Sequence, residues 1–245
     1  MRIPILKGTI RRRLLVNFRA DPEIVKRLIP EPFTPKLHNG FAIIGICLIR
    51  LEHIRPRFLP EWLGFSSENA AHRIAVEWTD AEGDLCEGVF IPRRDSGSAL
   101  NRFAGGRIFP GQHHPASFSI RDDLKHVDFN MQAIDGSVSM RVVGEESETL
   151  PASSCFSSLA EVSEFFESGS LGYSVTRDDQ RLDGLILRTI DWRIAPFQVS
   201  DVYSSFYEEP KYFPAGSVEY DHALIMRNIR HEWHSAGDLC CKTRS

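Results

Sequence analysis

Three segments of the chain carry side chains that could act on a small organic acid. Arg11 opens the first apolar run, and a guanidinium offers a planar fork of donors that suits a carboxylate. Glu68 stands just ahead of another apolar run, and a glutamate in an apolar pocket can have a raised pKa and exchange a proton. The third segment, residues 107–115, reads Arg-Ile-Phe-Pro-Gly-Gln-His-His-Pro. These residue types suit acid–base chemistry on a carbonyl or carboxylate compound if the fold brings them together.

The elements that must position these residues are mostly strands. Residues 13–19 and 40–53 are rich in β-branched and aliphatic residues, which favours strands. Residues 21–29 form a predicted helix, because Asp21 is a good N-cap, Pro22 suits the first helical position and apolar residues recur on one face.

Turn signals arrive often in the rest of the chain, and strands do not alternate regularly with helices. The fold class we expect is therefore mainly β: one antiparallel domain over residues 1–245, with a curved or barrel-like sheet and a few short helices. The further expected strands are 72–78, 85–91, 116–120, 126–133, 137–143, 182–192, 197–203 and 217–229, and the further expected helices are 96–103 and 159–167.

Composition narrows the class of protein. Hydrophobic residues make up 42% and charged residues 25% of the 245 residues, as in an ordinary globular protein with a full core. The net charge of −4 gives no reason to expect a nucleic-acid partner, and no apolar run is long enough to predict a membrane span. Five cysteines without CxxC spacing predict neither a disulfide framework nor a structural zinc site. We expect a cytoplasmic protein.

The expected helix after the opening strand begins with Asp21-Pro22-Glu23 and ends with Pro30-Glu31-Pro32. With these motifs and the opening strand, residues 8–120 resemble the acetoacetate decarboxylase family. It implies the family's curved antiparallel sheet and a homo-oligomer, a dimer or larger. It also implies that the family's site arginine falls on Arg11 and its site glutamate on Glu68, which become the candidate catalytic residues.

The resemblance fails at the family's reactive lysine. In the family this lysine follows an aromatic-proline pair, whereas here Phe109 and Pro110 are followed by Gly111 and Gln112. Neither residue has an amine that could form an imine with a keto acid, so we do not expect Schiff-base decarboxylation. The candidate substrate-binding residues of this segment are Arg107, Phe109, Gly111, Gln112 and His113.

Two functions stay open at this stage. The chain is either a lyase- or hydratase-type enzyme, with Glu68 as proton carrier and Arg11 as anchor, or a non-catalytic small-molecule-binding protein that kept the pocket. Arg11 and Glu68 could also simply pair with each other as a structural ion pair. No cofactor and no metal are expected.

The histidines suggest a metal site only weakly. Adjacent strand residues such as His113 and His114 point to opposite faces, so both reach one ion, with His72 as a third ligand, only from a loop. His231 and His234 fit a terminal strand edge or a subunit contact better than a metal site.

Overall fold

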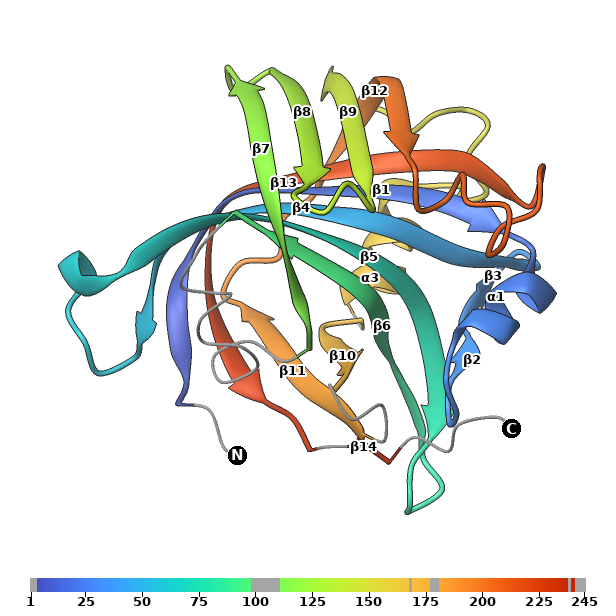
Figure 1. Cartoon of the computed structure of the whole chain (residues 1–245), viewed down its shortest axis with the longest axis horizontal. Coiled ribbons are helices and arrows are strands. Elements are labelled where there is room, and N and C mark those ends of the chain that lie inside the picture. The colour runs from blue at the N-terminus through green and yellow to red at the C-terminus, as the bar shows by residue number, and fades with distance from the viewer. Residues whose placement is uncertain (1–3, 98–110, 168, 177–180, 238, 241–245) are drawn as a thin grey trace.

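The structure is a computed structural model that describes residues 4–97, 111–167, 169–176, 181–237 and 239–240 (Figure 1). Its strands are β1 (Leu6–Ala20), β2 (Thr34–Pro35), β3 (Leu37–His38), β4 (Phe41–Pro56), β5 (Phe65–Thr79), β6 (Leu85–Ser96), β7 (His113–Asp122), β8 (His126–Ala133), β9 (Ser139–Glu146), β10 (Leu171–Val175), β11 (Arg181–Thr189), β12 (Ala195–Ser204), β13 (Val218–Ser235) and β14 (Leu239–Cys240). Its helices are α1 (Pro22–Leu28) and α3 (Leu159–Glu167), and η1 (Glu61–Leu63) is a single 3-10 turn.

The strands form one 14-stranded sheet that closes on itself twice. The smaller circuit runs through β5, β6, β10, β11, β13, β1 and β4, and the larger circuit runs through β5, β6, β7, β8, β9, β12, β13, β1 and β4. Both circuits use β13, β1, β4, β5 and β6, which are called the shared strands below. Figure 1 shows β7, β8, β9 and β12 above the shared strands and β10 and β11 below them.

Side chains alternate between the two faces along each shared strand, as the pleat of a β-strand requires. One set, with Leu14 of β1 and Ile46 of β4, faces the larger circuit and packs in one cluster with Phe129 of β8. The intervening set, with Cys47 of β4 and Arg73 of β5, faces the smaller circuit and lines a cavity. The position of a residue in this alternation therefore decides whether its side chain packs in the main core or reaches the cavity.

The two helices cover parts of the sheet. Asp21 caps α1, since its carboxylate accepts a hydrogen bond of 2.8 Å from the backbone N–H of Glu23. Helix α3 buries Val162, Phe165 and Phe166 on the cavity side of the shared strands. Neither helix in the described part of the chain is long and apolar enough to cross a membrane.

The expected fold class is confirmed: the protein is mainly β, with few helices and a closed sheet that is antiparallel except where β6 pairs in parallel with β7 and with β10. The helix expected at 159–167 and the capped helix near 21–29 are both present. Of the helix expected at 96–103, Ser96 instead ends β6, and residues 98–103 lie outside the described residues. The C-terminal edge expected at 231–234 is not an edge, because that part of β13 pairs with β1 on one side and β11 on the other.

Two histidines are buried in the sheet without an acidic partner among the described residues. His72 is fully buried, its Nε2 lies 2.8 Å from Ser204 Oγ, and burial together with the charge of Arg93 lowers its pKa to about 3. His231 is 1% exposed, and burial lowers its pKa to about 4. Both are therefore neutral at pH 7 in the folded protein.

We expect these histidines to make the free energy of unfolding fall as the pH drops below about 6.5. The unfolded chain takes up protons near the ordinary histidine pKa of about 6.5, whereas the folded chain stays neutral until its lowered pKa is reached. In this pH range each histidine lowers the free energy of unfolding by about 1.4 kcal/mol for each pH unit of acidification. Urea unfolding between pH 7 and pH 4.5 measures the slope.

His72→Gln should reduce that slope by up to one proton, because glutamine keeps a polar group near Ser204 without titrating. The matched control is His126→Gln, because the side chain of His126 is 63% exposed. An equal slope in His72→Gln and the wild type would show that His72 is not held neutral by the fold.

Candidate active site

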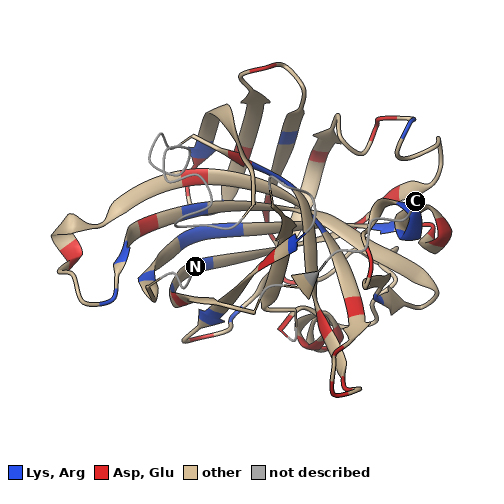
Figure 2. Ribbon diagram, turned by 60° about the horizontal axis from the view of Figure 1, so that its bottom comes forward, with Lys and Arg blue, Asp and Glu red and all other residues tan. Residues whose placement is uncertain are grey.

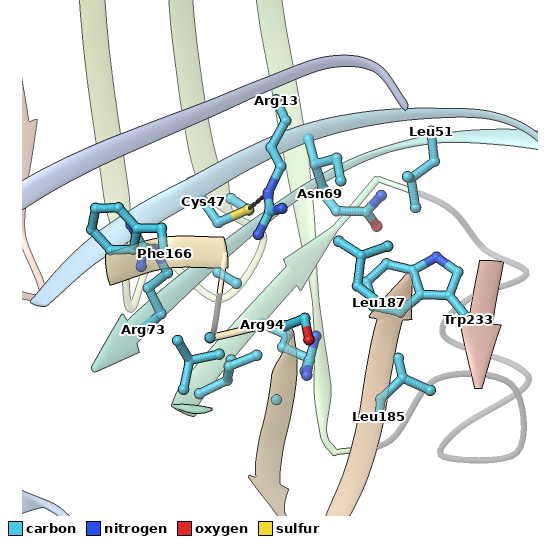
Figure 3. A pocket seen from close by; sticks show the side chains of 18 of the residues that line it. Arg13, Cys47, Leu51, Asn69, Arg73, Arg94, Phe166, Leu185, Leu187 and Trp233 are labelled. Atoms are coloured by element: carbon cyan, nitrogen blue, oxygen red, sulfur yellow. Dashed lines mark hydrogen bonds between the residues drawn. The ribbon is translucent and has the colours of Figure 1, made fainter. Parts of the chain in front are cut away.

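A cavity of about 130 Å³ lies on the face of the shared strands that the smaller circuit encloses. Its wall is mostly apolar, and Figure 3 shows Leu185, Leu187 and Trp233 on one side of it. This volume is far more than a single water needs, so the cavity can hold a small organic compound.

Three arginines enter this cavity from three different strands: Arg13 from β1, Arg73 from β5 and Arg94 from β6 (Figure 3). Arg13 Nε donates to Cys47 Sγ at 3.4 Å. Arg94 Nε donates to Ser174 Oγ at 3.0 Å, and burial lowers the pKa of Arg94 to about 10. Neither contact is with a carboxylate.

Arg73 is the most deeply enclosed of the three, with only 4% of it exposed. Its guanidinium donates to Asn17 Oδ1 and lies 4.5 Å from the centroid of the Phe166 ring, a cation–π distance. Its Nε has no hydrogen-bond partner among the described residues. Burial lowers the pKa of Arg73 to about 10.

No carboxylate of the described residues forms an ion pair with Arg13, Arg73 or Arg94. Asp95 also lines the cavity, but it accepts hydrogen bonds from Arg93, at 2.9 Å from Nη2 and 3.0 Å from Nε. Burying a charge without a partner is costly, so positively charged cavities of this kind are suited to binding anions.

A buried hydrogen-bond chain holds Arg73 in place. His222 Nδ1 lies 2.6 Å from Asp221 Oδ1, and His222 Nε2 lies 2.9 Å from Asn17 Nδ2. Burial alone would raise the pKa of Asp221, but hydrogen bonds from His222 and Ser154 hold it well below its ordinary value. An ionised Asp221 keeps the proton on His222 Nδ1, so Nε2 accepts from Asn17 and leaves Asn17 Oδ1 free to accept from Arg73.

Glu68, the predicted proton carrier, does not line the cavity. It belongs to the opposite face of β5 and makes an ion pair of 2.8 Å with Arg12, while Arg12 also contacts Asp122 at 3.3 Å. Burial raises the pKa of Glu68, although the charges of Arg12 and Arg50 oppose this. The ion pair considered for Glu68 thus exists with Arg12 in place of Arg11. Figure 2 shows that acidic and basic residues are interspersed along the chain.

Arg11, the predicted anchor, is exposed and donates to Asn228. The physical reason is a bulge: the register between β1 and β4 shifts between Ile10 and Arg12. A bulge re-aims the extra residue, and here it turns Arg11 away from the cavity that Arg13, two residues later, enters. The expectation that Arg11 and Glu68 meet in one pocket is corrected by this geometry.

The third predicted segment lies beside the cavity. His113 lines it, and Gln112 lines a neighbouring hollow together with Arg94 and Ser174. A side chain at Gly111 would meet Ser174, because a Cβ there would lie 2.6 Å from Ser174 Cβ. Arg107 and Phe109 lie outside the described residues.

Sequence reasoning missed the arginines that line the cavity, although each carried a signal. Arg73 interrupts an apolar strand between Ala71 and Ala75, and Arg13 directly precedes a run of aliphatic residues. A charged residue within a buried strand indicates either an internal ion pair or a ligand site. Metal-ligand clusters of three or more histidine, cysteine, aspartate or glutamate side chains are not found in the part of the chain that the structure covers.

The DUF2071 family profile, which describes an uncharacterized conserved protein, matches residues 7–200. The chain belongs to this family. No curated protein shows a significant match to the chain.

Among solved structures, acetoacetate decarboxylase from Legionella pneumophila is similar with a TM-score of 0.60 and 10% identity, over 96% of this chain and 88% of that one. An acetoacetate decarboxylase-like enzyme from Sphingomonas wittichii has a TM-score of 0.58 and 10% identity, over 98% and 94%. The enduracididine biosynthesis enzyme MppR, complexed with pyruvate, has a TM-score of 0.57 and 13% identity, over 99% and 92%. This DUF2071 protein therefore has the acetoacetate decarboxylase fold.

Gly111 gives a test of the packing beside the cavity in this DUF2071 protein. Gly111→Ala should lower the free energy of unfolding, both because alanine is strained at a φ of +85° and because overpacking against Ser174 costs about 1–3 kcal/mol. In the control Gly136→Ala, at φ +73°, nothing lies within 4 Å of the new Cβ, so the free energy of unfolding should fall only by the backbone strain. Chemical denaturation of both variants measures the difference, and equal losses would contradict the close approach. A lysine at 111 would carry the same strain.

Proposed function

We propose that the cavity binds a small organic anion with a carbonyl or carboxylate group, held by Arg13, Arg73 and Arg94. The observation that carries this proposal is that three guanidiniums line one largely apolar cavity without a carboxylate partner in the described chain. A ligand carboxylate supplies the missing counter-charge and fits the planar fork of a guanidinium. The complex of MppR with pyruvate supports an anionic carbonyl ligand in a protein of this fold.

The chemistry we propose excludes an imine. The described residues that line the cavity include no lysine, and Lys36 is engaged elsewhere by Glu87 at 2.5 Å. Acid–base turnover by a lyase- or hydratase-type enzyme would need a proton carrier inside the cavity, where the described lining offers Cys47, Asp95, His113 and Glu167. Binding of the anion is the function that the contacts support best.

A non-catalytic binding protein is the second candidate function. The position of Glu68 on the opposite face of β5 favours this candidate. The ion pair between Asp95 and Arg93 favours it too, because both carboxylate oxygens of Asp95 already accept hydrogen bonds from Arg93. In either case the protein binds a small molecule, and we propose a homo-oligomer in the cytoplasm.

Replacing Arg13 by methionine should weaken the binding of pyruvate or acetoacetate at least tenfold, which is about 1.4 kcal/mol. The matched control is Arg11→Gln, which removes the same charge two residues away but outside the cavity. Isothermal titration calorimetry measures both. If Arg11→Gln loses affinity and Arg13→Met keeps it, the anchor predicted from the sequence is correct and the cavity assignment is wrong.

Incubation with acetoacetate and borohydride should leave the mass of the protein unchanged, because no lysine is found among the described residues that line the cavity. Intact-mass spectrometry checks this, with an imine-forming decarboxylase as the positive control. An adduct trapped on any lysine, for example Lys125 or Lys211, would mean that a nucleophile exists elsewhere and that Schiff-base chemistry is retained.

A further inference from the structure

We propose that Cys47 is the nucleophile of the cavity and that its thiol captures small carboxylates which carry an electrophilic carbon, such as unsaturated keto acids. This proposal rests on the proposed function, since the cavity arginines hold the carboxylate of the reacting compound. It goes beyond that function because it assigns a covalent step to a residue that the binding of an anion does not require.

The register of the sheet places Cys47 among the three cavity arginines. Cys47 of β4 lies opposite Ala71 of β5, and Ala71 lies opposite Arg94 of β6, so these residues form one row across three strands. Arg13 of β1 and Arg73 of β5 lie on the two strands that flank β4, each two residues from the direct partner of Cys47. Long side chains reach such diagonal neighbours. All five of these residues line the cavity.

Cys47 is a partly exposed free thiol with a cation directly beside it. Its Sγ accepts a hydrogen bond of 3.4 Å from Arg13 Nε, which the dashed line in Figure 3 marks. The thiolate is the nucleophilic form of cysteine, and neighbouring guanidiniums stabilise its negative charge. The surroundings of this sulfur therefore suit nucleophilic attack.

Two other free cysteines have the opposite surroundings. Cys86 Sγ lies 3.6 Å from Asp80 Oδ2. Burial and the charge of Asp221 raise the pKa of Cys155 to about 12. A carboxylate beside a thiol disfavours the thiolate and repels an acidic compound. Cys86 and Cys155 therefore serve as internal controls for Cys47.

Arg73 points independently to a ligand beside Cys47. It lines the cavity, only 4% of it is exposed, and its Nε has no hydrogen-bond partner among the described residues. A buried donor without a partner is costly, and the carboxylate of a ligand supplies the acceptor. Because Arg73 is a diagonal neighbour of Cys47, a carboxylate held there brings its own carbon chain alongside the sulfur.

The covalent step needs no further reactant. In an unsaturated keto acid the double bond is conjugated to the ketone, and the sulfur of Cys47 bonds to the alkene carbon that is β to this ketone. The π electron pair moves to the neighbouring carbon, which takes up the proton that the thiol has released. No group leaves, and nothing is oxidised or reduced.

The test compares 4-oxopent-2-enoate with its methyl ester, which has nearly the same shape and no negative charge. Mass mapping of peptides from the full chain gives the rate of adduct formation at each cysteine, and the urea-unfolded protein gives the reference. In the folded protein the acid-to-ester rate ratio at Cys47 should exceed its unfolded reference by about tenfold or more, because a positively charged cavity concentrates anions. The ratios at Cys86 and Cys155 should stay at or below their references.

Two variants and one competitor locate the reaction. Arg13→Met should lower the acid-to-ester ratio at Cys47 toward its unfolded reference, whereas the matched control Arg11→Gln should keep the wild-type ratio. Saturating pyruvate should slow adduct formation at Cys47 and leave the rate at Cys86 unchanged. A wild-type ratio in Arg13→Met, or equal rates at Cys47 with and without pyruvate, would contradict a reaction inside the anion site.

The outcomes separate this proposal from the proposed function. If Cys47 forms no adduct, or if its ratio equals the unfolded reference, the nucleophile is wrong. Calorimetric titration with pyruvate and acetoacetate then decides the proposed function by itself: retained binding leaves it standing, and absent binding overturns it as well. Should Arg13→Met fail to fold, the wild-type ratio and the effect of pyruvate decide.

Discussion

The alternation of side chains along the shared strands is the constraint on which the rest of the structure depends. Because these strands belong to two closed circuits at once, both of their faces are enclosed. Residues of one parity fill the main core with Phe129, while residues of the other parity face the cavity. A shift of one residue in the strand register moves every side chain to the other face, so a small register change decides which polar groups line the cavity.

Buried cations give the cavity its chemical character. The described lining of the cavity holds guanidiniums, which stay protonated and bind anions but do not attack carbonyls. The chain from Asp221 through His222 and Asn17 shows that Arg73 is fixed by the protein before any ligand arrives. A preorganised guanidinium loses little conformational entropy on binding, so the cavity is suited to recognition of a small anion.

The fold was predictable from the sequence because its signals are local. The cap at Asp21, the apolar face of residues 159–167 and the alternating runs each reflect backbone chemistry within a few residues. The proposed site was predictable only in part: of the residues expected there, Gly111, Gln112 and His113 lie at or beside the cavity. Arg11 lies outside the cavity because of the bulge after Ile10, which depends on pairing with β4, and Glu68 because the face on which it lies depends on the whole sheet. Tertiary pairing of this kind leaves no local trace in the sequence.

A crystal structure of the protein soaked with a small carboxylate tests the central claim most directly. The account predicts electron density for the acid inside the smaller circuit, with its carboxylate oxygens within hydrogen-bond distance of guanidinium nitrogens of Arg13, Arg73 or Arg94. Density beside Arg11 or Glu68, with the cavity arginines paired to a carboxylate of the protein itself, would contradict it.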